Sequence, residues 1–336
     1  MEEIDVEAML KRSTVRDDLP LLVSGSFPSE QAARDLANNV MAIAKLFGSI
    51  FDLTALDGIT VADDYNEALQ GIERGYLGMN APTATRDEFG AGQAMAVPVL
   101  RNGKHKSHVV VNSLLARPLV DPEGPYYQFA VHTLCHEFAH VYDHMLRSEA
   151  LSGLYGSQIT DLREATLTHL SMAAWDEYAA SRLSAPWGTT SYCSEWEQSL
   201  IPMLDTILVR AEAAKKEFVV HRNAEQTMFE LREIFGSFLI RSAYLVGHID
   251  GIESSIEAEA PTLAKNLDGT TWLKDIWNRF LKILCDMFAK IGSWVGVETY
   301  GPLNELFETL LRKGGLQLLK LPQGGYYAGF VKTPSL

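Results

Sequence analysis

Apolar residues recur at helical spacing between Tyr126 and Arg147, a stretch that contains neither glycine nor proline. The apolar positions that share one helical face are Val131, Leu134, Phe138, Val141 and Met145. Just before this stretch, residues 121–125 contain two prolines and a glycine, which interrupt regular structure. The pattern therefore predicts a helix that buries one face in a core and turns the other face towards a cleft.

Shorter patterns precede this helix. Ser29 can cap a helix over residues 29–50, a short strand is predicted over 58–62, and a second helix begins at Asp63 or Asp64. Two further strands are predicted over residues 94–100 and 105–112, joined by the hairpin dipeptide Asn102-Gly103. This order of elements predicts an α+β domain with an antiparallel or mixed sheet.

Helical periodicity dominates the rest of the chain. Asp161 and Glu164 form a capping-box-like start to a helix that ends before Pro186. Four later stretches have apolar periodicity, namely 195–219, 224–250, 271–291 and 302–313, and we expect loops at 251–270 and 292–301. We therefore expect an N-terminal arm (1–28), an α+β domain (29–190) and an all-helical C-terminal lobe (191–336).

The central helix contains the sequence His136-Glu137-Phe138-Ala139-His140, which fits the pattern H-E-x-x-H. The two histidines lie about 40° apart around the helix and one turn apart along it, so both imidazoles can bind one Zn²⁺. Glu137 lies about 100° from His136. That direction is unfavourable for the same tetrahedron but suits a general base that activates a water. The motif predicts a zinc site at His136 and His140 with Glu137 as the catalytic residue.

A catalytic zinc site needs a third protein ligand and one open position. Leu146 stands where a third histidine would follow the second motif histidine by six residues, so the ligand must come from another element. The helix over 161–184 offers Glu164, His169, Asp176 and Glu177. We favour Glu177, because its neighbours one turn away are all alanine or serine and would allow two helices to approach closely. The alternative is that these small residues serve only helix packing and that Glu177 is not a metal ligand.

Other polar residues near the motif are less informative. His105 and His108 point to opposite faces of a strand, so we expect them at the surface. His132 and His144 continue the histidine ladder of the central helix, and we expect them in solvent. A donor that stabilises the reacting oxygen is expected from a tyrosine or histidine of the C-terminal region. The sequence does not rank the five candidates Tyr155, Tyr178, Tyr192, His221 and His248.

These motifs resemble a known group of enzymes. The sequence 136–140, followed by Glu177-Tyr178-Ala179-Ala180-Ser181, is similar to the zincin metallopeptidases whose third zinc ligand is a glutamate on a later helix. The second segment is loosely similar to that of the ImmA/IrrE-type intracellular peptidases. The resemblance covers about residues 55–190 and implies a zincin-like fold. It also implies a sheet edge that holds an extended peptide, for which the hairpin 93–112, and within it His108–Asn112, is the expected candidate.

Net charge, apolar runs and cysteine number indicate which binding partners and which cellular compartment to expect. The chain has 336 residues and a formal net charge of −14, so nucleic acid is not expected as a partner. No apolar run reaches membrane-spanning length, and no basic-then-apolar segment follows the first residues, so neither a membrane nor secretion is expected. The odd number of widely spaced cysteines, Cys135, Cys193 and Cys285, suits a reducing cytoplasm.

The sequence as a whole predicts a cytoplasmic zinc metallopeptidase, a hydrolase that cuts a peptide or protein substrate. His136, His140 and Glu177 would bind Zn²⁺, and Glu137 would act as general base. The alternative is a regulatory or interaction protein that keeps a zincin fold and its zinc site without turnover. The sequence indicates neither the substrate nor the oligomeric state.

Overall fold

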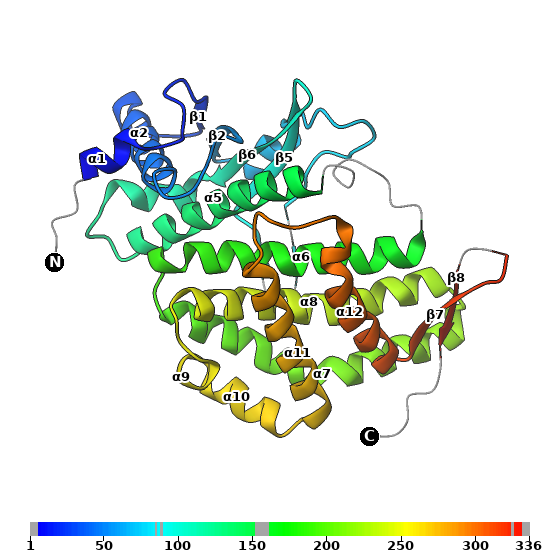
Figure 1. The fold of residues 1–336 in the computed structure, drawn as a ribbon. Helices are drawn as coiled ribbons and strands as arrows, with labels where there is room; N and C mark the ends of the chain where they lie inside the picture. Colours follow the sequence, from blue (N-terminus) through cyan, green and yellow to red (C-terminus); the bar gives the residue numbers. More distant parts are fainter. Residues whose placement is uncertain (1–5, 85, 88–89, 152–160, 324–325, 331–336) are drawn as a thin grey trace. The chain divides into compact units, whose positions relative to one another are not determined.

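The computed structural model of the chain describes residues 6–84, 86–87, 90–151, 161–323 and 326–330 (Figure 1). It forms a mixed α+β fold that divides into two compact units. The first unit comprises Met1–Glu149 and Leu183–Thr189, and the second comprises Ala150–Arg182 and Thr190–Leu336. The loop expected at residues 152–157 lies outside the described residues.

The first unit is built on a small mixed sheet with the strand order β1-β2-β6-β5. Its strands are β1 (Leu21–Ser24), β2 (Leu56–Ala62), β5 (Ala94–Arg101) and β6 (Lys104–Asn112). β1 and β6 both pair with β2 in parallel, whereas β5 and β6 form an antiparallel hairpin. Asn102 and Gly103 both have positive φ, as the predicted tight turn requires. β1 lies within residues 1–28, which were expected to form an extended arm. This segment therefore contributes a strand to the sheet.

The expected free edge at His108–Asn112 is wrong, because these residues lie in the interior of the sheet. β6 pairs with β2 on one side and with β5 on the other. The outer strand on that side of the sheet is β5, and the backbone N–H of Leu100 donates to the carbonyl of Arg74 outside it, at 2.7 Å. Val109, Val110 and Val111 are fully buried, which agrees with their uninterrupted apolar pattern.

The helices of the first unit begin where the polar caps predict. In α2 (Glu30–Phe47), the Ser29 side chain accepts a hydrogen bond from the N–H of Ala32. Asp64 caps α3 (Tyr65–Gln70) in the same way, through the N–H of Glu67. The remaining elements described in this unit are α1 (Val6–Lys11), β3 (Arg86–Asp87), β4 (Gly90–Ala91), α4 (Ser113–Ala116), η1 (Arg117–Val120), α5 (Tyr127–Ala150) and η2 (Ala185–Trp187).

The second unit is mainly helical. Its helices are α6 (Leu162–Ser184, whose last two residues belong to the first unit), α7 (Ser191–His221), α8 (Ala224–Gly251), α9 (Ile256–Glu259), α10 (Pro261–Asp268), α11 (Thr271–Phe288), η3 (Val297–Tyr300) and α12 (Gly301–Lys313). The four helices predicted from periodicity are confirmed. The predicted loop at 251–270 is wrong, because it contains α9 and α10. The lobe expected to be all-helical also carries a hairpin of β7 (Leu316–Lys320) and β8 (Tyr326–Phe330).

α6 packs into the core of this helical unit. Leu167, Leu170 and Trp175 belong to the same apolar cluster as Phe235 and Phe280. The boundary expected at residue 190 thus differs from the division of the structure, which groups residues 150–182 with the later helices. Periodicity identifies the apolar face of a helix but does not tell which neighbour covers it. Among the described residues, no helix has the length and apolar character needed to cross a membrane.

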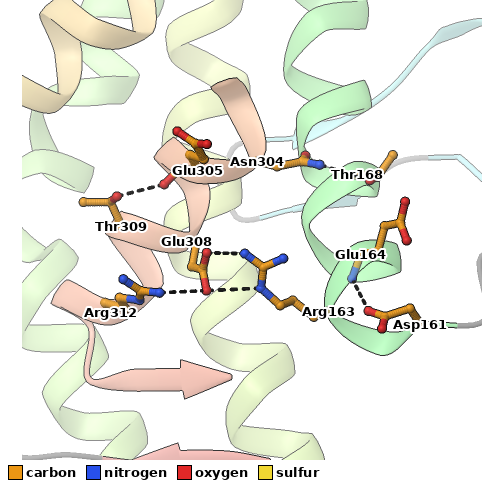
Figure 2. Close-up of polar contacts among 9 residues, drawn as sticks. All are labelled: Asp161, Arg163, Glu164, Thr168, Asn304, Glu305, Glu308, Thr309 and Arg312. Atoms are coloured by element: carbon orange, nitrogen blue, oxygen red, sulfur yellow. Dashed lines mark hydrogen bonds and ion pairs between the residues drawn. The ribbon is translucent and has the colours of Figure 1, made fainter. Parts of the chain in front are cut away.

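A polar cluster joins the first half of α6 to α12 within the helical unit (Figure 2). The Glu308 carboxylate accepts hydrogen bonds from the guanidinium groups of Arg163 and Arg312, with Nε–Oε1 and Nη2–Oε1 distances of 3.2 and 3.0 Å. The amide of Asn304 donates to the hydroxyl of Thr168 and accepts from that of Ser171. These contacts fix the position of α6 relative to α12.

Glu308 predicts a pH dependence of stability. Burial opposes its ionisation, but hydrogen bonds and charge from Arg163, together with Arg312, outweigh burial and lower the pKa of Glu308. A carboxylate with a lowered folded-state pKa stabilises the fold above its unfolded pKa of about 4.3, and this stabilisation is lost as pH falls through the folded pKa. Glu308→Gln should therefore lower the unfolding free energy by about 1–3 kcal/mol at pH 7 and progressively less towards pH 3.

Urea unfolding of both proteins across this pH range measures the difference. Glu305 is exposed on the same helix and provides a matched control, since Glu305→Gln should leave stability unchanged. A Glu308→Gln difference that stays constant between pH 7 and pH 3 would show that the ionised carboxylate is not the source of the stabilisation.

Candidate metal centre

The two motif histidines lie side by side on α5, as the helical spacing predicts. Their Nε2 atoms are 3.1 Å apart, and the two rings are nearly perpendicular, with centroids separated by 4.7 Å. Two nitrogens bound to one tetrahedral zinc at 2.0–2.1 Å would be about 3.3 Å apart. Both side chains are buried. The pair therefore already has close to the separation that a shared ion requires.

α5 is held by contacts on several sides within the first unit. Phe138, on the predicted core face, lies against Phe47 of α2, with ring centroids 6.1 Å apart. Asp143 forms an ion pair of 2.6 Å with Arg147 one turn later, and both side chains are almost completely inaccessible to solvent. Charges buried this deeply need such partners, and the pair ties the last turns of α5 together. The helix thus presents its histidines from a rigid support.

Glu137 is buried beside the histidine pair, and 6% of its surface is exposed. Its negative charge acts on Tyr65, the first residue of α3: burial raises the pKa of the Tyr65 hydroxyl, and the Glu137 carboxylate raises it further. Tyr65 was not among the candidate residues predicted from sequence. The only sequence signal there is Asp64, which marks the start of α3 and thereby the position of the tyrosine.

Two groups of three side chains in the described part of the chain are close enough to hold a metal ion. One group is His136, His140 and Glu177, and the other is His140, His144 and Asp176. Within each group, the ligand atoms, one from each residue, all lie within 4.8 Å of one another. Imidazole nitrogens with one carboxylate are donors that zinc accepts, so both groups fit the ion chemically. Glu137, Glu164 and His169 belong to neither group.

Small residues around Glu177 have a packing role within the helical unit. A side chain on Gly247 of α8 would meet the backbone carbonyl oxygen of Tyr178 at 2.5 Å and the Cβ of Ser181 at 3.0 Å. α8 therefore approaches α6 so closely at Ser181 that only small residues fit. The small neighbours from which the ligand role of Glu177 was predicted are partly explained by this contact, which weakens that argument from sequence.

The histidines expected at the surface or in solvent are more enclosed than predicted. His144 Nδ1 lies 3.0 Å from the hydroxyl of Ser107 on β6, and His132 Nε2 lies 3.5 Å from that of Ser184. Both imidazoles are buried. His105 and His108 are half-buried, and they lie within hydrogen-bonding distance of the hydroxyls of Tyr76 and Thr60, respectively. The position of a histidine along its own helix or strand cannot reveal such partners, because the partners lie on other elements of the chain.

Several of the predicted oxyanion donors already have partners in the helical unit. The hydroxyl of Tyr178 donates to the Asp250 carboxylate at 2.5 Å and accepts from Arg182 at 2.6 Å. His221 accepts a hydrogen bond from the backbone N–H of Asn223. The rings of Tyr192 and His248 lie edge to face. Tyr155 lies outside the described residues.

Cys135, next to the first motif histidine, is buried, and burial raises the pKa of its thiol. A thiol that resists ionisation is a poor metal ligand, which agrees with its predicted role as a small buried apolar residue.

Comparisons of the whole chain with protein-family models, with curated proteins and with solved structures find no match in any of the three.

Proposed function

We propose that the chain is a zinc-dependent metallopeptidase of zincin type, with His136, His140 and Glu177 as zinc ligands and Glu137 as general base. The observation that carries the proposal is the separation of 3.1 Å between two buried imidazole nitrogens on one helix, with a buried glutamate directly after the first histidine. A buried structural site would have no use for that carboxylate.

Each residue has a defined task in this proposal. When bound, zinc lowers the pKa of a water molecule and polarises the scissile carbonyl. His136 and His140 hold the ion from consecutive turns of α5, and a carboxylate oxygen of Glu177 completes the protein ligands. Glu137 accepts the proton of the water that attacks the carbonyl carbon, and it then donates this proton to the amine that leaves.

The choice of Glu177 over Asp176 rests on two observations. The group that contains Glu177 includes both motif histidines, whereas the group that contains Asp176 replaces His136 by His144. The Nε2 atoms of His136 and His140 also lie 3.1 Å apart, close to the separation that a shared ion requires. We therefore assign Glu177 as the carboxylate ligand of an ion bound between those two nitrogens.

A peptide library tests the activity. The chain is stripped of metal, reloaded with one equivalent of zinc and incubated with the library, and the products are read by mass spectrometry. We expect cleavage at defined peptide bonds, its loss on chelation and its return when zinc is added back. Cleavage that persists equally in the metal-free protein and in a His136→Gln, His140→Gln variant would contradict the proposal.

A further inference from the structure

Two exposed aromatic side chains lie at the start of α5, the helix that carries the motif histidines. Tyr126 directly precedes the helix and is 68% exposed, and Phe129 in the first turn is 42% exposed. Among the residues whose burial the structure describes, only one further aromatic side chain is exposed, that of Phe229 in α8. Exposed aromatic surface in the described chain is therefore concentrated at the start of α5.

The two rings share the face of α5 that carries the motif histidines. At about 100° per residue, five positions fall within one arc of about 80°, namely Tyr126, Phe129, Thr133, His136 and His140. This arc lies opposite to the apolar stripe that is buried in the core. Thr133 lies between the rings and the histidines, and its hydroxyl donates to the carbonyl of Phe129 at 3.0 Å. The hydroxyl is thus bonded within the helix and needs no partner from a ligand.

The backbone that carries the rings is fixed within the first unit. The N–H of Ala130 donates to the carbonyl of Tyr126 at 3.0 Å, which continues the helical hydrogen bonding up to the first ring. Gln128 points about 100° away from Phe129. Its side-chain amide donates to the backbone carbonyl of Trp187 in η2. The start of α5 is therefore anchored on another side, with both rings left exposed.

The position of the rings suits apolar side chains of a bound peptide. Single apolar residues are normal at a protein surface, but neighbouring large ones mark interaction sites. With a helical rise of about 1.5 Å per residue, Phe129 lies about 10 Å and Tyr126 about 15 Å from His136 along the axis. An extended peptide advances about 3.3 Å per residue, so these distances correspond to about three and about four to five residues.

We propose that Phe129 and Tyr126 form a subsite for apolar side chains of the substrate, and that the protein prefers peptides with an apolar residue about three positions from the bond that is cut. The proposal rests on the proposed function, because it takes an ion between His136 and His140 as the reacting centre. The continuity of the rings with the metal-binding face favours the substrate over a second copy of the chain as the occupant. One side of the substrate then lies along the first turns of α5.

Cleavage of designed peptides tests the preference. The best peptide of the library is varied to carry phenylalanine or serine at the third residue from the cut, on either side. On one side, the zinc-loaded parent should cut the phenylalanine peptide with a kcat/KM about tenfold higher, as expected from partial burial of the ring. Phe129→Ser should remove this preference. A parent that cuts both peptides equally well on both sides would overturn the subsite and leave the peptidase function intact.

Ile50→Ser is the matched control, because Ile50 is 52% exposed in the same unit but does not belong to α5. The next residue, Phe51, packs against Tyr142, which lies on a different side of α5. The control should keep the full preference, and an equal loss in Ile50→Ser and Phe129→Ser would overturn the subsite. Tyr126→Ser keeps the test decisive if Phe129→Ser does not fold, since it should reduce a preference at the fourth or fifth residue from the cut.

Tripeptide hydroxamates test the subsite without turnover, because the hydroxamate chelates zinc while the peptide contacts the protein. The probes carry the hydroxamate at either end and phenylalanine or serine as the residue farthest from it. Calorimetry with the zinc-loaded parent should show about tenfold tighter binding of one phenylalanine probe than of its serine counterpart, and Phe129→Ser should bind the two equally. No binding, no difference in the parent, or a difference that Phe129→Ser retains would overturn the subsite. If the difference appears but the parent cuts no peptide, the peptidase function fails and the subsite stands.

Discussion

Glu137→Gln is expected to lower peptide hydrolysis by about 10²–10⁴-fold, the usual contribution of a general base. Glutamine has the same shape as glutamate but cannot accept the proton of the attacking water. Because Glu137 belongs to neither group of potential metal ligands, the variant should still bind one equivalent of zinc. Removal of a buried negative charge should not unfold α5. Initial rates with the best peptide of the library, measured beside zinc content, give the result.

Glu149→Gln is the matched control, since Glu149 is exposed near the end of the same helix. It should hydrolyse peptides at the rate of the parent. A Glu137→Gln protein that is folded, carries zinc and still cuts at the parental rate would exclude Glu137 as the base. A variant that loses zinc together with activity would instead identify Glu137 as a ligand.

Glu177→Ala is expected to weaken zinc binding by more than the roughly 10–100-fold that loss of an outer-shell partner typically costs. The reason is direct, since alanine removes one of three protein ligands. His136 and His140 would remain, and two imidazoles hold zinc far less tightly than a complete set. Competition with a chromophoric chelator at limiting zinc measures the affinity.

Asp176→Ala and Glu164→Ala are the controls for this prediction. Asp176 is next to Glu177 and belongs to the alternative group with His144, so the two variants together identify the carboxylate that binds the ion. Glu164 is exposed in the first turn of α6 and belongs to neither group. Full zinc occupancy in Glu177→Ala, with loss in Asp176→Ala, would assign the site to His140, His144 and Asp176.

The local elements could be predicted from the sequence because their signals are local. Ser29 and Asp64 cap their helices, Asn102 and Gly103 turn the hairpin, and Asp161 accepts a hydrogen bond from the N–H of Glu164. Strand order could not be predicted in the same way. Whether β6 lies inside the sheet depends on its pairing with β2, and no pattern within 105–112 encodes that neighbour.

The candidate site, too, could be predicted only where its sequence signals are local. The spacing of His136 and His140 alone predicts that both imidazoles can converge on one ion, and their Nε2 atoms lie 3.1 Å apart. Tyr65 lies more than seventy residues before Glu137 in the sequence. Its link to Glu137 depends on how the first turn of α3 packs, which sequence periodicity does not describe. The enclosure of His144 by Ser107 was missed for the same reason.

X-ray absorption at the zinc edge identifies the atoms that bind the ion. Metal-free protein is loaded with one equivalent of zinc, and the spectrum reports the atoms bound to it. We expect two imidazole nitrogens and oxygen ligands at about 2.0–2.1 Å, and we expect the Glu137→Gln variant to change the spectrum only beyond these directly bound atoms. A sulfur ligand at about 2.3 Å, or a spectrum that His136→Gln and His140→Gln leave unaltered, would contradict it.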